Sequence, residues 1–517
     1  MVNKGKLMLQ NNASRTQNVT KNLMVGIISK AFLLVATFVT RTLFIRILGA
    51  EYTGISSLYS NILSLLNLAE LGFGSVLTYE LYKPLRDNDE EMVTDLVALF
   101  KKIYSVIIVV VLAFGLLLVP FLKYIVKSDL NQTDLLIYYL LYLTDSVASY
   151  FVAYRTMVIE ADQKQYVTNL TEIIARFAMY ICQSVYLIVA RNFLGYLVIQ
   201  VLFTIIKNMA LHLISLKMYP FLTPQKVTTN KPLNTRRIYR NAKAMCVTKI
   251  SGVILTQTDS IIISILLGTI YVGYYTNYYM LIIYLNSIYS IIVTSMEASV
   301  GNLNAEENQE KSYSIYKRID FLLSSINVFC VAEFVCIVQN FITVWIGEEY
   351  IQGWPLIIAL MVTFYLQQSM NTVLIYRQTM GLFVAVKKAY PIMAMLNIIL
   401  SIWLGKIMGI AGVALATGVS RLLTVFWYEG KIVFQKMGQS MWQYLLSQIK
   451  RFSFLLITVA VAFRLSLMVS MCTITGIIFK GIMTGLVVLV CLFAAYHRTA
   501  EWKWAVNYVL QKIRRKI

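Results

Sequence analysis

The sequence predicts an all-α integral membrane protein of about 14 transmembrane helices, in two pseudo-symmetric lobes of six helices each plus two C-terminal helices. Three observations support this fold class. Hydrophobic residues make up 58% of the 517-residue chain, well above the roughly 45–50% of soluble domains. Apolar stretches of about 20 residues recur with short polar connections, and that length lets a helix cross a bilayer with its backbone hydrogen bonds satisfied internally. The third observation is an internal repeat.

The repeat relates residues 30–54 to residues 249–273, 219 positions further along the chain. In both copies a lysine precedes a long apolar run that ends in the pattern Leu-Gly-x-x-Tyr-x-Gly. The pattern comprises Leu48, Gly49, Tyr52 and Gly54 in the first copy, and Leu267, Gly268, Tyr271 and Gly273 in the second. A direct repeat predicts two lobes of the same topology, each with an even number of spans, related by an axis along the membrane normal.

The first half of the chain begins with a polar tail at 1–21 and continues with the first lobe at 22–216. Its spans are expected at 22–48, 55–81, 98–122, 135–157, 169–190 and 193–216. The first apolar run is too long for a signal peptide, so it is expected to remain as the first span. The segment 217–243 carries seven Lys and Arg residues and no acid, which predicts a cytoplasmic linker between the lobes.

The second lobe, at 244–430, repeats this order. Its spans are expected at 244–267, 270–298, 319–341, 356–379, 389–407 and 410–430. Its fourth span closes with Tyr376-Arg377, as the fourth span of the first lobe closes with Tyr154-Arg155.

The C-terminal segment 431–496 holds the last two spans, at 452–471 and 474–496. The tail 497–517 alternates apolar with basic residues, which predicts an amphipathic helix along the inner leaflet. A solvated basic end that helps to set the topology is the alternative for this tail.

The charge distribution predicts the orientation. The chain carries 46 Lys and Arg residues against 25 Asp and Glu residues, and most of the basic residues fall in segments on the same side as the N-terminal tail. Because basic residues favour the cytoplasmic side, both termini are expected in the cytoplasm, and no nucleic-acid partner is needed to explain the charge. The six cysteines form no CxxC pair and only two histidines are present, so neither a metal site nor a cofactor is expected.

Basic residues inside the predicted spans are the first candidate functional residues, because an unpaired ion at the helix centre costs about 2.5–3.5 kcal/mol on insertion scales. Lys30 and Arg41 lie eleven positions apart, which places them on nearly the same helix face. Lys249 takes the place of Lys30 in the repeat, and Arg421 lies deep in the twelfth span. These four residues predict a cationic surface that binds an anion. The alternative is that Lys30 reaches back to the cytoplasmic interface.

Acidic residues near the midplane are the second group of candidates: Glu70, Asp259 and Glu333. A carboxylate there is a candidate site for a coupling proton or sodium ion, or half of a structural ion pair between helices. Glu172 and Arg176 lie four positions apart on the fifth span and are expected to pair with each other. The sequence holds no nucleophile–base motif, no phosphate-binding glycine loop and no large outer loop, so an enzyme is not predicted.

Several segments resemble the Wzx-type polysaccharide flippases, which belong to the superfamily of the MATE drug exporters and the lipid II flippase. The resemblance covers about residues 20–496. Its most specific pieces are Leu48-Gly-Ala-Glu-Tyr-Thr-Gly54, Leu71-Gly-Phe-Gly74, Thr258-Asp259-Ser-Ile-Ile-Ile263, Trp345-Ile-Gly-Glu-Glu-Tyr350 and Gly409-Ile-Ala-Gly-Val-Ala-Leu-Ala-Thr417. The resemblance implies a MATE-like fold whose two lobes enclose a V-shaped cavity. It also places Asp259 where relatives tend to have an acid.

The function that this resemblance implies is transport of a polyprenyl-diphosphate-linked oligosaccharide from the inner to the outer leaflet of the bacterial plasma membrane, for capsule, O-antigen or exopolysaccharide assembly. The implied partners are that lipid-linked substrate and membrane lipids. A polysaccharide polymerase and its chain-length machinery, and coupling to H⁺ or Na⁺, stay open expectations.

Three alternatives remain. A MATE-type exporter of cationic drugs would present an acidic cavity, and a lipid II flippase would share the predicted chemistry. A membrane glycosyltransferase, polymerase or ligase would need a sizeable outer loop, and the longest outer loops expected here are about a dozen residues.

Overall fold

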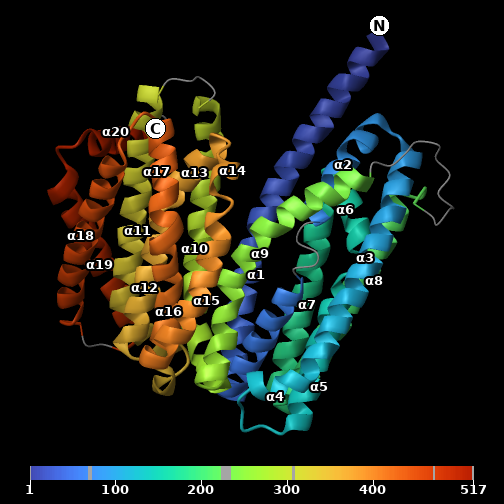
Figure 1. Ribbon diagram of the computed structural model, residues 1–517, viewed down its shortest axis with the longest axis horizontal. Helices are drawn as coiled ribbons and strands as arrows, with labels where there is room; N and C mark the ends of the chain where they lie inside the picture. The colour runs from blue at the N-terminus through green and yellow to red at the C-terminus, as the bar shows by residue number, and fades with distance from the viewer. Residues whose placement is uncertain (1, 68–72, 223–234, 305–308, 470–471, 515–517) are drawn as a thin grey trace. The chain divides into compact units, whose positions relative to one another are not determined.

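The computed structural model describes residues 2–67, 73–222, 235–304, 309–469 and 472–514, without the side chains of some helical stretches such as 2–31 and 235–249. The chain divides into two compact units, Met1–Gly273 and Tyr274–Ile517 (Figure 1). Unit 1 therefore includes a helix that the sequence assigned to the second lobe. The division into lobes around 217–243 stays a prediction.

The described residues of unit 1 are mainly helical. Its helical elements are α1 (Val2–Leu66), α2 (Phe73–Asp87), α3 (Glu90–Leu118), the 3₁₀ turn η2 (Val119–Phe121), α4 (Leu122–Ile125), α5 (Gln132–Ser149), α6 (Ala153–Ala161), α7 (Gln165–Ala190), α8 (Phe193–Met218) and α9 (Thr235–Leu266). Helix α10 (Thr269–Asn304) begins at the end of this unit.

Unit 2 continues in the same way. Its helices after α10 are α11 (Gln309–Trp345), the 3₁₀ turn η3 (Glu348–Tyr350), α12 (Trp354–Ser369), α13 (Asn371–Thr379), α14 (Phe383–Val386), α15 (Ala389–Met408), α16 (Ile410–Arg421), the π-helical segment η4 (Leu422–Phe426), α17 (Trp427–Lys436), α18 (Met441–Ser466), α19 (Ile474–Tyr496) and α20 (Ala500–Arg514). Segments α16, η4 and α17 run on without a break and form one span, Ile410–Lys436.

The polar turns carry side chains that cap the helices they precede. Asp89 accepts a hydrogen bond from the backbone nitrogen of Met92 at 3.1 Å, at the start of α3. Asn131 and Asn192 cap α5 and α8 in the same way, and Ser440 with Gln443 forms a capping box at α18. These side chains satisfy N–H groups that the first turn of a helix leaves without partners.

The described residues contain eleven helices long and apolar enough to cross a membrane, or twelve if α5 and α6, bent by 42° at their junction, form one broken span. Each predicted span has a helical counterpart. The number of spans is lower than the 14 predicted from the sequence for two reasons. Helix α1 contains the first predicted span and part of the second, and the apolar part of α9, Gly252–Leu266, is short. The chain is thus an all-α, multi-pass membrane protein, as the sequence predicted.

The repeated Leu-Gly motif forms a sharp turn in both copies. Gly49 interrupts α1 with φ of 88°, and Gly268 separates α9 from α10 with φ of 119°. These positive φ values favour glycine because residues with a Cβ rarely adopt them.

The last glycines of the two motifs bring the two turns together. A Cβ added to Gly54 would overlap the carbonyl oxygen of Thr269, and a Cβ added to Gly273 would overlap that of Ala50. Because Ala50 and Thr269, like Gly54 and Gly273, occupy equivalent places in the repeat, each copy contacts the other through the same backbone atoms.

Candidate functional site

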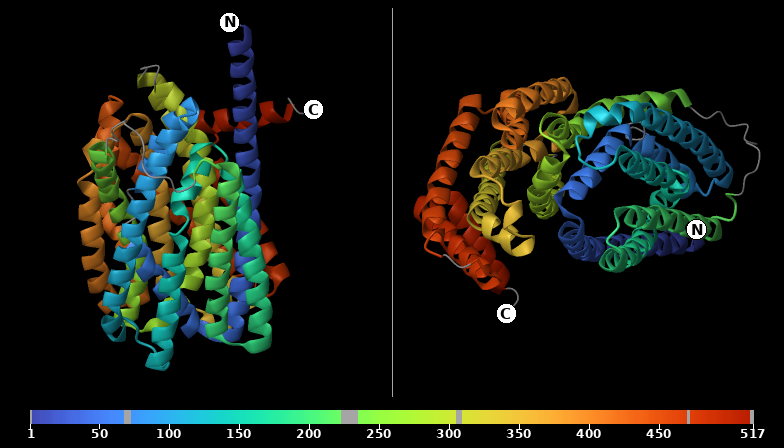
Figure 2. Two further views of the ribbon diagram at one scale, coloured as in Figure 1. Left: turned by 90° about the vertical axis from the view of Figure 1, so that its right-hand side faces the viewer. Right: turned by 90° about the horizontal axis from the view of Figure 1, so that it is seen from below.

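A polar cavity of 530 Å³ lies inside unit 1, between helices that are otherwise apolar. The right panel of Figure 2 shows the helices of this unit arranged in a ring. The lining residues come from both halves of α1 and from α5, α7 and α8: Thr37, Thr40, Arg41, Phe44, Ser56, Ser60, Leu63, Ser64, Asn67, Tyr142, Asp145, Ser146, Ser149, Ala175, Arg176, Met179, Tyr180, Tyr196, Gln200, Phe203, Thr204 and Lys207.

Polar residues at helical spacing build two of its walls. Ser56, Ser60 and Ser64 recur every four residues along the second half of α1. On α8, Gln200, Thr204 and Lys207 follow one another at steps of four and three. Residues at these spacings share one helix face, so each helix turns a polar stripe toward the cavity.

Three cations line the cavity. Arg41 donates through Nη2 to Ser57 Oγ at 3.4 Å, and its guanidinium lies 5.8 Å from the ring centre of Phe44. Arg176 forms the predicted ion pair with Glu172 at 2.7 Å. Lys207 has no carboxylate within salt-bridge distance in the described part of the chain.

Asp145 is the carboxylate of the cavity wall, and neighbouring side chains hold both of its oxygens. Thr204 donates to Oδ1 at 2.5 Å, and Gln200 donates to Oδ2 at 2.7 Å. Hydrogen bonds to both oxygens of a carboxylate fix its position. Asp145 therefore ties α5 to α8 and orients the polar stripe that ends at Lys207.

Further hydrogen bonds fix the remaining wall. Tyr142 donates to Ser56 at 2.6 Å, and Ser146 donates to Asn67 at 3.1 Å. Hydroxyl and amide groups near fixed cations can hold phosphate oxygens and sugar hydroxyls, while aromatic rings such as that of Tyr142 can cover sugar ring faces.

Of the four residues predicted to bind an anion, Arg41 lines this cavity. The side chains of Lys30, Lys249 and Glu70 lie outside the described residues. Asp259, on α9, is 6% exposed and does not line the cavity. Its neighbour Ser260 accepts a hydrogen bond from Asn61 of α1 at 2.7 Å, which joins α9 to α1 near this acid.

Arg421 lies in unit 2, beside a buried charge network. Arg377 donates to Glu429 Oε1 at 2.7 Å, and Tyr390 donates to the same oxygen at 2.8 Å. Arg421 is within electrostatic reach of Glu429 and Tyr390. Because Arg41 belongs to the other unit, the predicted joint anion site of Arg41 and Arg421 remains a prediction.

Glu333, on α11, faces two glycines of α19. A Cβ at Gly481 or Gly485 would lie 3.6 or 3.5 Å from its carboxylate oxygens. Further along α11, Asn340 accepts a hydrogen bond from the buried Lys480 at 3.0 Å. In the described residues Glu333 forms no ion pair within 4.0 Å, so its role as a coupling acid stays a prediction.

The sequence interpretation did not single out Asp145 or Lys207 as site residues. Both lie inside predicted spans, where a charge was itself the criterion for a candidate. The sequence signal that could identify them is a polar face on an apolar helix. Gln200, Thr204 and Lys207 form one such face on α8, and the serines of α1 form another.

Comparison with known proteins relates the chain to one family by sequence and to several solved structures by fold. The family model described as "Polysaccharide biosynthesis protein" matches residues 16–296. No curated protein matches the chain.

Solved structures share the fold at low sequence identity. The lipid II flippase MurJ in an inward closed conformation has 14% identity and a TM-score of 0.68, covering 92% of this chain and 99% of its own. An inward-facing multidrug resistance MATE family transporter of the MOP superfamily has 13% identity and a TM-score of 0.61, covering 79% of this chain and 96% of its own. A MOP superfamily transporter from Pyrococcus furiosus has 12% identity and a TM-score of 0.51, covering 82% and 97%.

Proposed function

Because the chain belongs to the polysaccharide biosynthesis protein family, we propose that it flips a polyprenyl-diphosphate-linked oligosaccharide from the inner to the outer leaflet of the bacterial plasma membrane. The observation that carries this proposal is the cavity of unit 1, in which Arg41 and Lys207 stand among hydroxyl and amide groups inside a membrane-spanning bundle. Such a lining suits a diphosphate followed by sugars. The polyprenyl tail stays in the lipid, where its apolar chain is already stable.

The fixed cations reduce the cost of bringing the diphosphate away from water. An ion in the hydrocarbon region without partners is expensive, whereas guanidinium and ammonium groups at Arg41 and Lys207 replace part of its hydration. We propose that Lys30, Lys249 and Arg421 extend this set as the substrate moves. Asp259, Glu333 and Glu70 are the proposed acids for a coupling proton or sodium ion.

The membrane potential can supply part of the driving force. Two negative charges that move outward across an inside-negative membrane gain about 4.6 kcal/mol per 100 mV. Loaded transit would follow this gradient, and rocking between two arrangements of the repeats would exchange access to the two sides. The proposed orientation has both termini in the cytoplasm.

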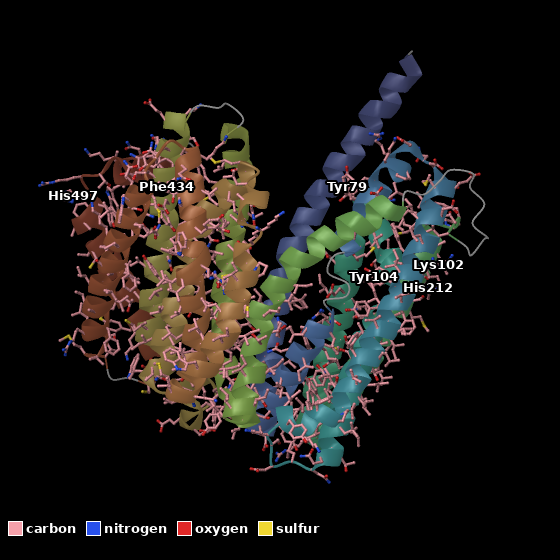
Figure 3. The ribbon with its side chains drawn as sticks, in the orientation of Figure 1. Tyr79, Lys102, Tyr104, His212, Phe434 and His497 are labelled. Atoms are coloured by element: carbon pink, nitrogen blue, oxygen red, sulfur yellow. The ribbon has the colours of Figure 1, made fainter. Side chains whose placement is uncertain are left out.

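The experiment that tests the proposal is native mass spectrometry of the chain purified from its host membranes. We expect bound polyprenyl-diphosphate sugars, and we expect their loss in Arg41→Gln and Lys207→Gln. The matched control is Lys102→Gln, because Lys102 is an exposed cation on α3 of the same unit and does not line the cavity (Figure 3).

Three other results would redirect the proposal. Retention of the lipid-linked sugar in Arg41→Gln, Lys207→Gln and Lys30→Ala alike would remove the anion-binding role of these cations. Lipid II as the bound species would assign a lipid II flippase, and amphiphilic cations alone would assign a drug exporter. Three cations and one carboxylate line the cavity of unit 1. This balance of charge suits an anionic substrate better than a cationic drug.

A further inference from the structure

A second cavity, of 390 Å³, lies within unit 2 at the meeting point of α11, α18, α19 and α20. Thr499 and Glu501, at the start of the C-terminal helix, form part of its wall. Trp502 fixes that helix, because its ring lies 6.3 Å from Phe321 and 6.0 Å from Phe493. Figure 2 shows α20 running crosswise to the helices of its unit. The cavity is therefore closed on one side by α20.

The sequence around this cavity places it at a membrane surface. On α18, Lys450 and Arg451 are followed by the apolar run 452–463, and on α11 the charges end at Asp320 before another apolar run. On α19, the apolar run ends at Tyr496. Such a change from charged to apolar residues marks the lipid–water interface, and a crosswise amphipathic helix such as α20 lies in that plane.

One of the three cations of this cavity forms no ion pair within the described residues. Asp320 is 2% exposed in its side chain and pairs with Arg451. Glu501 lies 4.0 Å from the ammonium group of Lys317. Lys450 is exposed and forms no ion pair in the described part of unit 2. Three cations and two carboxylates thus line the cavity, and both carboxylates already face a cation.

Hydroxyl groups supply hydrogen-bond donors inside the cavity. The side chains of Tyr313, Ser324 and Tyr496 line it, and within the described residues none of their hydroxyls bonds to a protein group. Phe434 lies at the inner wall of the cavity, and His497 follows α19 at the outer edge of this unit (Figure 3). Ammonium and hydroxyl donors together match the oxygens of a phosphate ester.

We propose that this cavity binds the phosphate headgroup of an anionic phospholipid, with Lys450 at its mouth and the acyl chains on the outward apolar faces of α18 and α19. Exposed side chains such as Leu456 and Leu489 form those faces. Basic pockets between membrane helices are a known way to select anionic headgroups. These apolar faces favour a lipid over free phosphate.

The test is native mass spectrometry of the full chain in detergent, titrated with phosphatidylglycerol and with phosphatidylcholine of the same acyl chains. We expect phosphatidylglycerol to bind more tightly. Lys450→Gln should weaken that binding by about fivefold, a typical effect of one cation near the headgroup. Lys436→Gln is the matched control, because it removes an exposed lysine of α17 that does not line the cavity.

A second variant changes the charge in the opposite direction. Glu501→Gln releases Lys317 from its carboxylate, so phosphatidylglycerol should bind more tightly than to the unmodified chain. Equal binding of the two phospholipids, or equal loss in Lys450→Gln and Lys436→Gln, would overturn the proposal. Binding of inorganic phosphate or of a polyprenyl diphosphate at Lys450 in place of phosphatidylglycerol would also overturn it, and would assign the cavity to that ligand.

Discussion

The Cα atom of Gly54 lies against the carbonyl oxygen of Thr269, so that a methyl group on Gly54 would overlap that oxygen. Gly273 has the same relationship to Ala50. We predict that Gly54→Ala and Gly273→Ala each destabilise the protein by about 1–3 kcal/mol, the usual cost of overpacking. The measurement is thermal unfolding in detergent.

Gly252→Ala is the control for this pair. Gly252 lies within helix α9, and a Cβ there meets no atom within 4 Å. Alanine in an open helical position stabilises a protein by about 0.4–1 kcal/mol. A melting temperature lowered equally by all three substitutions would show that loss of any glycine, and not the contact between the repeats, is responsible.

The ion pair of Arg377 and Glu429 should tolerate the loss of both charges better than the loss of one. Their side chains are 11% and 0% exposed. Glu429→Gln leaves the guanidinium without its counter-ion, and breaking such a buried pair costs about 3–5 kcal/mol. We expect the double variant Arg377→Met, Glu429→Gln to regain much of that stability. Additive losses in a double-mutant cycle would contradict the prediction.

Thr204→Val tests whether Asp145 organises the cavity of unit 1. The substitution keeps the shape of the side chain and removes the hydroxyl that donates to Oδ1. A hydrogen bond to a charged group contributes about 1.5–3 kcal/mol, so Thr204→Val should destabilise the protein by up to that amount. Ser64→Ala should be nearly neutral, because Ser64 donates to the Ser60 carbonyl of its own helix. Equal melting temperatures for the two variants would rule out this role of Asp145.

Cys472 offers a test of the proposed orientation. It is exposed in the short connection between α18 and α19, which the prediction places outside the cell. A membrane-impermeant maleimide should label it in intact cells, and Cys472→Ser should remove that label. In that background, Lys102→Cys should react only after the membrane is opened. Labelling of Lys102→Cys in intact cells would reverse the topology.

The helical elements could be predicted because apolar runs and polar connections are properties of the local sequence. The turn at Gly49 was predictable for the same reason, since its motif recurs at Gly268. The helix count was less certain. Whether a chain ends one span or bends within it depends on packing, as the 42° bend between α5 and α6 shows.

The candidate site could be predicted only in part. Arg41 was found from its charge in an apolar run. The contact between Asp145 on α5 and Thr204 on α8 joins residues 59 positions apart, and one sequence gives no register between two such helices. A polar stripe shows that a face is not lipid-exposed, but it does not show which helix that face meets.

The π-helical segment Leu422–Phe426 changes the relative orientation of the side chains that flank it. Arg421 and Glu429 are eight residues apart, and in an uninterrupted α-helix they would point roughly 80° away from each other. A π-bulge accommodates one extra residue, so the two side chains are offset as if by seven positions, roughly 20° apart. If the same residues formed a regular α-helix without the bulge, Arg421 would rotate away from Glu429 while every charge stayed in place. The electrostatics of this span therefore depend on its local helical geometry as well as on the identity of its residues.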